Sequence, residues 1–329
     1  RIYAIVIYSA AVRDNLRRQR REKVMPIKVQ SDLPVRAILE QENIFVMDET
    51  RALNQNIRPL KIGILNLMPL KEDTELQILR SLSNTPLQLD ITFITVSSHE
   101  SKNTAQSHIN KFYEPFCEVK KRRFDGLIIT GAPVEQMEFE EVDYWNELVE
   151  IMDWADAHVT STFFICWGAQ AAMYHFYGLK KRLLPQKLFG LYRHKVENRK
   201  EPLIRGFDDE FYAPHSRHTT VDAEEIRACS DLTILAESDE AGVFIAMAEE
   251  GRKIFVFGHP EYDRLTLEKE YVRDKNKGLD IQVPKNYFPD DNSDNRPLLM
   301  WRAHANTLYT NWINYYVYQN TPYVWDDEE

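Results

Sequence analysis

The chain has 329 residues, of which 43% are hydrophobic and 28% charged, and a net charge of −10 at neutral pH. This composition is typical of a globular protein; no segment approaches the roughly 20 apolar residues of a membrane-spanning helix, and a net acidic chain is a poor partner for nucleic acid. Three separated cysteines, Cys117, Cys166 and Cys229, predict neither a disulfide framework nor a metal site, so we expect a reducing, cytoplasmic compartment.

The first 24 residues join an apolar segment to a basic one and precede Met25-Pro26, which looks like a second beginning. In a secretory signal the positive charge comes before the apolar segment, whereas here most of it follows. We therefore expect residues 1–24 to be an upstream or vector-derived extension and residues 25–329 to form a single domain. The acidic end, 326–329, is expected to be disordered.

Apolar segments rich in branched and aromatic side chains predict buried parallel strands in the first half of the chain. They cover residues 60–67, 89–96, 124–130 and 159–165. Apolar residues at helical spacing predict helices at 34–41, from 71 onward, and at 144–158. This alternation is typical of an α/β fold with a doubly wound, mostly parallel sheet flanked by helices.

The second half of the chain predicts shorter strands and turns that extend or flank the main sheet. These strands are expected at 188–196, 211–213, 219–221, 232–237, 243–248 and 253–258. A helix is expected at 265–277, and a long closing helix at 298–319 carries an aromatic stripe that we interpret as packing. No repeat or linker interrupts the chain, which favours one domain with an elaborated C-terminal half.

Cys166 lies where the strand 159–165 turns abruptly into a helix, because Gly168 and a run of helix-forming residues follow it. Free N–H groups at the start of a helix favour a thiolate and can bind an oxyanion formed on an attacked carbonyl. Cys166 is therefore a candidate nucleophile. A buried cysteine that packs beneath the helix is the alternative on this segment alone.

His259 and Glu261 directly follow the apolar strand 253–258. Residues two apart in an extended segment point to the same side, so the carboxylate can steady the imidazolium. The ends of parallel strands meet at one edge of a sheet, where ligands bind, which would bring both residues close to Cys166. Each could be structural on its own, but together with Cys166 they predict a nucleophilic triad for acyl transfer.

Six sequence motifs resemble those of the homoserine O-acyltransferases of bacterial methionine biosynthesis, within the class I glutamine amidotransferase-like superfamily. The motifs are NLMPLKEDTE (66–75), TGAPVE (130–135), FFICWGAQAA (163–172), PHSRHT (214–219), GHPEYD (258–263) and the tail 286–319. The resemblance covers the chain from Met25 onward, and residues 1–24 have no counterpart in it. It implies the flavodoxin-like, doubly wound fold of that superfamily.

The resemblance implies a ping-pong acyl transfer with an acyl-CoA as co-substrate and L-homoserine as acceptor. Cys166 attacks the thioester, CoA leaves, and the homoserine hydroxyl attacks the acyl-cysteine with His259 as base and Glu261 as the group that orients it. No other cofactor and no metal ion are implied. The family also leads us to expect a homodimer.

Further residues take roles only through the resemblance. Lys71 matches the family lysine that joins the backbone N–H of Trp167 in stabilising the oxyanion, and Arg273 matches the arginine that holds the homoserine carboxylate. Ser216 and Lys187 match substrate-binding positions. From its position alone, Lys71 is better interpreted as a solvated lysine at a helix start, and the sequence alone favours exposed polar residues for the other three.

Glu135 and, with it, Ser216 match positions that bear on the choice of acyl group. The resemblance associates glutamate at the first position with acetyl and glycine with succinyl. A succinyl group ends in a carboxylate, and a second carboxylate beside it in a partly dry pocket is unfavourable. We therefore expect acetyl-CoA as donor, with a homoserine O-succinyltransferase as the alternative.

Two other classes of protein are weighed against this expectation. A glutaminase subunit would use the same Cys166, His259 and Glu261, but Phe164 stands where those enzymes often have a glycine, and no synthase domain is recognisable. A binding or scaffold protein on a decayed triad is disfavoured, because all three members are intact.

Overall fold

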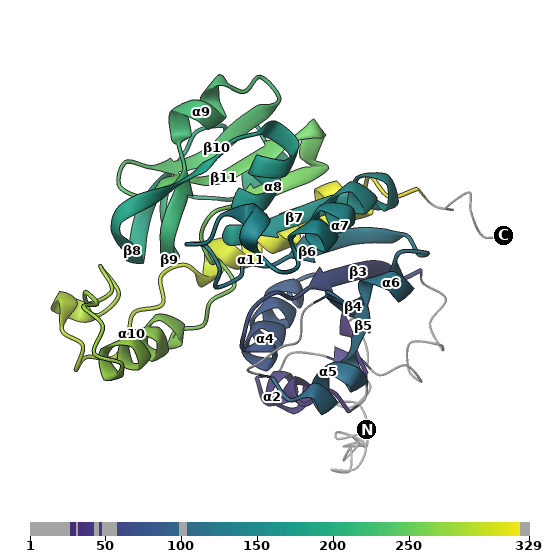
Figure 1. Ribbon diagram of the computed structural model, residues 1–329, viewed down its shortest axis with the longest axis horizontal. Coiled ribbons are helices and arrows are strands. Elements are labelled where there is room, and N and C mark those ends of the chain that lie inside the picture. The colour runs from purple at the N-terminus through teal and green to yellow at the C-terminus, as the bar shows by residue number, and fades with distance from the viewer. Residues whose placement is uncertain (1–26, 31, 43–45, 48–57, 99–103, 323–329) are drawn as a thin grey trace, which may run out of the picture.

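The computed structural model describes residues 27–30, 32–42, 46–47, 58–98 and 104–322. The expected extension 1–24 and the expected disordered end 326–329 lie outside these residues. Figure 1 shows one sheet that runs through the molecule with helices on both of its faces.

The sheet joins a parallel half to an antiparallel half. Its order is β2-β1-β4-β3-β6-β7-β12-β11-β10-β8-β9, with β5 paired to β4. The parallel strands are β1 (Ile27–Lys28), β2 (Val46–Met47), β3 (Leu60–Leu65), β4 (Leu89–Thr95), β5 (Tyr113–Pro115), β6 (Phe124–Ile129), β7 (Val159–Ile165) and β12 (Lys253–Val256). The antiparallel strands are β8 (Lys181–Val196), β9 (Glu210–Val221), β10 (Leu232–Ser238) and β11 (Gly242–Ala248). The expected doubly wound, mostly parallel sheet is confirmed.

Two apolar cores cover the two faces of the parallel half, because successive residues of a strand point to opposite sides. In β7, Phe163 and Ile165 belong to one core and Phe164 to the other. The first core is closed by α2 (Val35–Gln41), α4 (Lys71–Leu82), α5 (Gln106–Phe112) and α11 (Arg302–Asn311). The second is closed by α6 (Phe116–Val119), α7 (Trp145–His158), α8 (Trp167–Tyr177) and α9 (Ala223–Ala228).

Shorter helical elements complete the described part of the chain. They are η1 (Phe139–Glu141), η2 (Pro202–Ile204), η3 (Glu249–Gly251) and η4 (Pro289–Asp291). The helix α10 (Thr266–Asn276) lies beyond the ends of β8 and β9, away from the two main cores (Figure 1). A third, smaller core joins it to the sheet, with Phe189 and Leu191 of β8 packed among Leu267, Tyr271 and Trp301. The expected helix at 265–277 is thus confirmed.

The expectation of two separate strands at 211–213 and 219–221 is wrong, because β9 is continuous from Glu210 to Val221. Pro214, which has no backbone N–H, lies within this strand. However, β9 is the last strand of the sheet and pairs with β8 on one side, so the missing N–H of Pro214 is tolerated. The polar residues that follow Pro214 are part of the strand.

The expected uninterrupted helix at 298–319 is also wrong in its details. Residues before 302 are not helical: the N–H of Leu298 donates to the carbonyl of Tyr287 at 2.8 Å, and the Trp301 indole donates to the carbonyl of Tyr262 at 3.0 Å. The helix begins at Arg302 and continues beyond α11 as the π-helical segment η5 (Trp312–Tyr318). Trp312 and Tyr316 lie in the core with Ile313 and Val317, as expected from the stripe, whereas Tyr318 is exposed.

Candidate active site

Cys166 is held in a strained turn between β7 and α8. Its φ is +51°, a left-handed conformation that non-glycine residues rarely adopt outside functional turns. The backbone N–H of Cys166 donates to the carbonyl of Val256 in β12 at 2.7 Å, which fixes the turn to the neighbouring strand. The side chain is 5% exposed, so the sulfur lies in a largely dry environment at the first turn of α8.

Gly168 allows α8 to begin this close to the sheet. A Cβ atom at this position would lie 2.7 Å from the carbonyl oxygen of Thr130, which follows β6. No side chain can be accommodated at that distance without a shift of the backbone. The close approach therefore holds the free N–H groups at the start of α8, including that of Trp167, beside the end of β6.

His259 and Glu261 lie at the same edge of the sheet as Cys166. The strands β12 and β7 are parallel neighbours, with Val256 opposite Ile165, so their carboxyl ends emerge together. The Nδ1 atom of His259 is 2.8 Å from Oε1 of Glu261, and both side chains are buried. The spacing of two residues in the sequence thus predicted this contact correctly.

The charge state of His259 depends on its neighbours. Burial acts to lower its pKa, but the charges of Cys166 and Glu261 and hydrogen bonds to both side chains outweigh it, so the pKa is raised well above the usual value. The ring also stacks on Tyr262, with 4.1 Å between centroids. A thiolate–imidazolium pair oriented by a carboxylate is the arrangement that nucleophilic acyl transfer requires.

These residues open into a cavity of about 390 Å³, which we call the charged cavity. Lys187, Ser216 and Arg273, assigned to substrate binding by the resemblance, all line it together with Cys166 and His259. The structure therefore brings the predicted substrate-binding residues together with the triad at one site.

Glu270 is a residue of the charged cavity that sequence reasoning missed. Its Oε2 accepts a hydrogen bond from Ser216 at 2.6 Å and lies 3.3 Å from Nζ of Lys187, while its Oε1 accepts from Tyr262 at 3.1 Å. Glu270 lies three residues before Arg273, on the same face of α10, and that spacing was the signal that could have revealed it.

Arg273 is oriented by its own neighbour in the sequence. Its Nε and Nη2 atoms donate to the carboxylate of Asp274 at 2.6 and 2.9 Å, which also raises the pKa of Arg273. Asp274 lines the charged cavity as well. The fork of the guanidinium is thereby held in place, with its Nη1 donors left for a ligand, since no described residue accepts from them.

Glu135 lies in the loop after β6 and lines the charged cavity. Its Oε2 accepts a hydrogen bond from the backbone N–H of His218 in β9 at 2.9 Å. The loop that carries Glu135 is therefore attached to the strand that carries Ser216. Glu135 and Ser216, the two residues linked to acyl choice, face the same space as Cys166.

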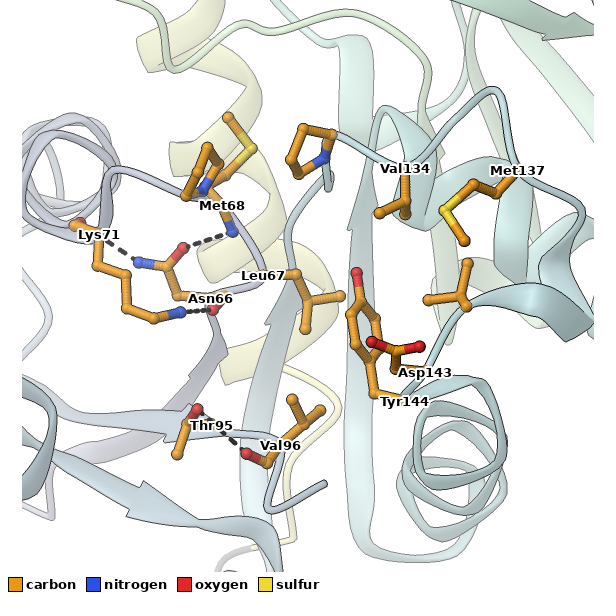
Figure 2. Close-up of a pocket in the computed structure, with 13 residues that line it drawn as sticks. Asn66, Leu67, Met68, Lys71, Thr95, Val96, Val134, Met137, Asp143 and Tyr144 are labelled. Carbon is orange, nitrogen blue, oxygen red and sulfur yellow. Dashed lines mark hydrogen bonds between the residues drawn. The ribbon is translucent and has the colours of Figure 1, made fainter. Parts of the chain in front are cut away.

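Lys71 lies beside the charged cavity and does not line it. It lines an adjoining cavity, shown in Figure 2, and its Nζ donates to the carbonyl of Asn66 at 2.6 Å. Burial lowers the pKa of Lys71 to about 8, although Glu75 acts to raise it. The proposed oxyanion role of Lys71 stays a prediction, because the ammonium group is engaged by the Asn66 loop. It is not the solvated lysine that its position alone suggested.

The described residues contain neither a cluster of side chains suited to a metal ion nor a helix long and apolar enough to cross a membrane. Cys117, Cys166 and Cys229 are all unpaired.

Residues 26–323 match the family model described as homoserine O-succinyltransferase. A homoserine O-acetyltransferase from Lachnoclostridium phytofermentans is 70% identical over 299 residues, which cover 91% of this chain and 99% of that protein. A protein of the same name from Agathobacter rectalis is 66% identical, covering 91% of this chain and 96% of its own length. A solved glutamine amidotransferase from Thermotoga maritima matches with a TM-score of 0.53 at 11% identity, over 78% of this chain and 97% of that one, which shows the fold alone.

Proposed function

This chain belongs to the homoserine O-succinyltransferase family, and on that premise we propose that it transfers the acetyl group of acetyl-CoA to the hydroxyl of L-homoserine. The observation that carries the proposal is the alignment of Cys166, His259 and Glu261 beneath a cavity with charged groups of both signs. The names of its relatives support acetyl transfer. A place in methionine biosynthesis, a cytoplasmic location and a homodimer follow from the family resemblance and form part of the proposal.

In the first half-reaction, the thiolate of Cys166 forms a bond to the acetyl carbonyl carbon of acetyl-CoA. The tetrahedral intermediate collapses, the carbon–sulfur bond to CoA breaks, and the CoA sulfur leaves with the electron pair. The imidazolium of His259 gives its proton to that sulfur. The products are free CoA, an acetyl-cysteine and a neutral imidazole.

In the second half-reaction, the neutral His259 takes the proton of the homoserine hydroxyl as its oxygen attacks the acetyl-cysteine. The new ester bond forms, the bond to the Cys166 sulfur breaks, and the thiolate–imidazolium pair is restored. Glu261 orients the ring and stabilises the imidazolium each time it forms.

The charged cavity suits the zwitterionic end of homoserine. The Nη1 donors of Arg273 can receive the carboxylate, and Glu270 with Asp274 can receive the ammonium group. The carboxylate of Glu270 is itself positioned by two residues. Ser216 donates a hydrogen bond to it, and Lys187 lies within ion-pair distance of it. Homoserine is thereby held with its hydroxyl free to face Cys166.

The oxyanion of each tetrahedral intermediate needs hydrogen-bond donors. The N–H of Trp167, at the start of α8, is one candidate, and the ammonium group of Lys71 is the second. For Lys71 to reach the intermediate, its Nζ must exchange the Asn66 carbonyl for the oxyanion, so this role is a proposal that the family resemblance supports.

Glu135 supports acetyl over succinyl. Its carboxylate lines the charged cavity together with Cys166, and the terminal carboxylate of a succinyl group would have to share that space. At about 4 Å the repulsion of two such charges amounts to about 4 kcal/mol near a protein surface. An acetyl group carries no such charge.

Mass spectrometry of the intact chain tests the proposal. Acetyl-CoA is expected to add one acetyl group, which L-homoserine then removes as O-acetylhomoserine. The Cys166→Ala variant should take up no acetyl group, whereas the control Cys229→Ala should behave as the unaltered chain. Faster modification by succinyl-CoA would contradict the acetyl assignment, and release of glutamate from glutamine without formation of an acetyl-enzyme from acetyl-CoA would favour the glutaminase instead.

A further inference from the structure

A second cavity, of about 280 Å³, adjoins the charged cavity. The two share one wall, built from Met68, Pro69, Pro133, Val134 and Met137. Their volumes lie close to the range of about 300–1,000 Å³ typical of small-molecule sites. Space for a ligand thus lies on both sides of this wall, beside Cys166 on one side and at the ends of β3 and β4 on the other.

The two cavities differ in chemistry. The charged cavity is lined by several ionic side chains of both signs. The second cavity is lined mainly by apolar side chains, with Lys71 and Asp143 as its charged residues, and we call it the apolar cavity. Figure 2 shows Lys71 and Asn66 on one side of it and Val134, Met137 and Tyr144 on the other, with Leu67 between them. The first cavity offers more charged partners to the two charged ends of an amino acid than the second does.

Polar groups at the edge of the apolar cavity are already engaged by the protein. The side-chain oxygen of Asn66 accepts from the N–H of Met68 at 3.1 Å, and its amide donates to the hydroxyl of Tyr113 at 2.9 Å. The Nζ of Lys71 donates to the Asn66 carbonyl. The cavity therefore suits an occupant that makes few hydrogen bonds, such as a chain of methylene groups with isolated amides, rather than a sugar or a nucleotide base.

We propose that the apolar cavity holds the pantetheine arm of the acyl-CoA donor, and that the thioester reaches Cys166 across the wall of Pro133 and Val134. The proposal rests on the function proposed above, since it assigns a place to one of the two substrates of that reaction. Each substrate then has its own cavity, and the two meet at the sulfur of Cys166.

Leu67→Trp tests this assignment. Leu67 lines the apolar cavity and not the charged one, and it is partly exposed, so a larger side chain would fill the space for the arm. Thr95→Trp, at the end of β4, fills the same cavity from another strand and serves as an independent variant. Leu183→Trp, at a residue that is 66% exposed and lines neither cavity, is the matched control.

Acetylation of Cys166 is measured with acetyl-CoA and with p-nitrophenyl acetate, a donor that delivers the same acetyl group without a pantetheine arm. Leu67→Trp and Thr95→Trp should lower kcat/KM for acetyl-CoA by about tenfold to a hundredfold, the usual effect of a misfit in an apolar pocket. Acetylation by p-nitrophenyl acetate and the KM for L-homoserine should stay within about twofold of the unaltered chain. Leu183→Trp should change neither the acetylation by acetyl-CoA, nor that by p-nitrophenyl acetate, nor the KM for L-homoserine.

The assignment would be overturned if both Leu67→Trp and Thr95→Trp lost acetylation activity equally with acetyl-CoA and p-nitrophenyl acetate. It would also be overturned if neither variant lost activity with either donor. An increase in the KM for homoserine without a change for acetyl-CoA would also overturn it, because the cavity would then belong to the acceptor. Failure of the proposed function is recognised separately: the unaltered chain would then form no acetyl-cysteine with acetyl-CoA.

Discussion

Glu261→Gln removes the negative charge that faces His259 while keeping the shape of the side chain. Glu261 Oε1 lies 2.8 Å from Nδ1 of His259, and the two side chains are 5% and 4% exposed. Its Oε2 has no hydrogen-bond partner among the described residues, so the substitution acts mainly through His259. Removing one member of a buried charged pair costs about 3–5 kcal/mol. At 1.36 kcal/mol per factor of ten, we expect both half-reactions to slow by about 10²–10⁴-fold.

The pH dependence of Glu261→Gln gives a second, independent result. The pKa of His259 is raised well above its usual value: burial alone would lower it, and Cys166 and Glu261 more than compensate. Removal of the acetyl group by homoserine needs the neutral ring, so its rate rises with pH through the pKa of His259 in the acetyl-enzyme. In that state Cys166 carries no charge, and Glu261 is the neighbour that stabilises the imidazolium. Without the Glu261 carboxylate the imidazolium of His259 is less stable, so the pKa of His259 falls. The acidic limb of the pH–rate profile should therefore move to lower pH, while the maximal rate drops.

Rapid-quench mass spectrometry of the pre-formed acetyl-enzyme mixed with homoserine measures both effects. Glu237→Gln, which removes the partner of Arg227 far from the charged cavity, is the matched control and should leave rate and pH limb unchanged. A loss of less than about threefold together with an unmoved limb would refute the orienting role of Glu261.

Three further predictions concern acyl choice, the oxyanion and the turn. Glu135→Gly should raise the ratio of succinyl-CoA to acetyl-CoA turnover by about tenfold to a hundredfold; Glu135→Gln keeps an acceptor for the N–H of His218, so an equal gain in that variant assigns the effect to charge, and no gain in either contradicts it. The acylation rate should decline at alkaline pH as Lys71, whose pKa is lowered by burial to about 8, loses its proton. Lys71→Arg should move this decline to higher pH, because an arginine stays protonated. An unmoved pH profile of acylation would exclude a role for the positive charge of Lys71. Gly168→Ala places a Cβ atom 2.7 Å from the carbonyl oxygen of Thr130. We expect it to lower the free energy of unfolding, measured by urea titration, by about 1–3 kcal/mol. An unchanged midpoint of the urea unfolding curve would contradict the close approach.

Local sequence patterns were enough to predict the centre of the site. The apolar strand before Cys166 and the helix after it are set by residues next to one another in the chain, and the contact of His259 with Glu261 spans two residues. The rule that ligands bind at the carboxyl ends of parallel strands then predicted that Cys166 and His259 lie at one edge of the sheet, and the structure shows that β7 and β12 are direct neighbours.

Features that depend on distant residues could not be predicted in the same way. Glu270 binds Ser216 across 54 positions of the sequence, so its spacing from Arg273 could indicate a shared face of α10 but not the contact with β9. The continuity of β9 past Pro214 depends on its place at the edge of the sheet, which only the complete strand order shows. Burial of Lys71, and with it the lowered pKa, likewise arises from tertiary packing.

The junction between the parallel and antiparallel halves of the sheet has a consequence for how such proteins diversify. The proposed nucleophile Cys166 and its proposed base His259 follow β7 and β12 on the parallel side, whereas Lys187 and Ser216 come from β8 and β9 on the other. Insertions or substitutions in the latter pair, or in α10, can alter which acceptor is recognised while the reactive sulfur keeps its geometry. New acceptor preferences can therefore evolve on an unchanged reactive centre.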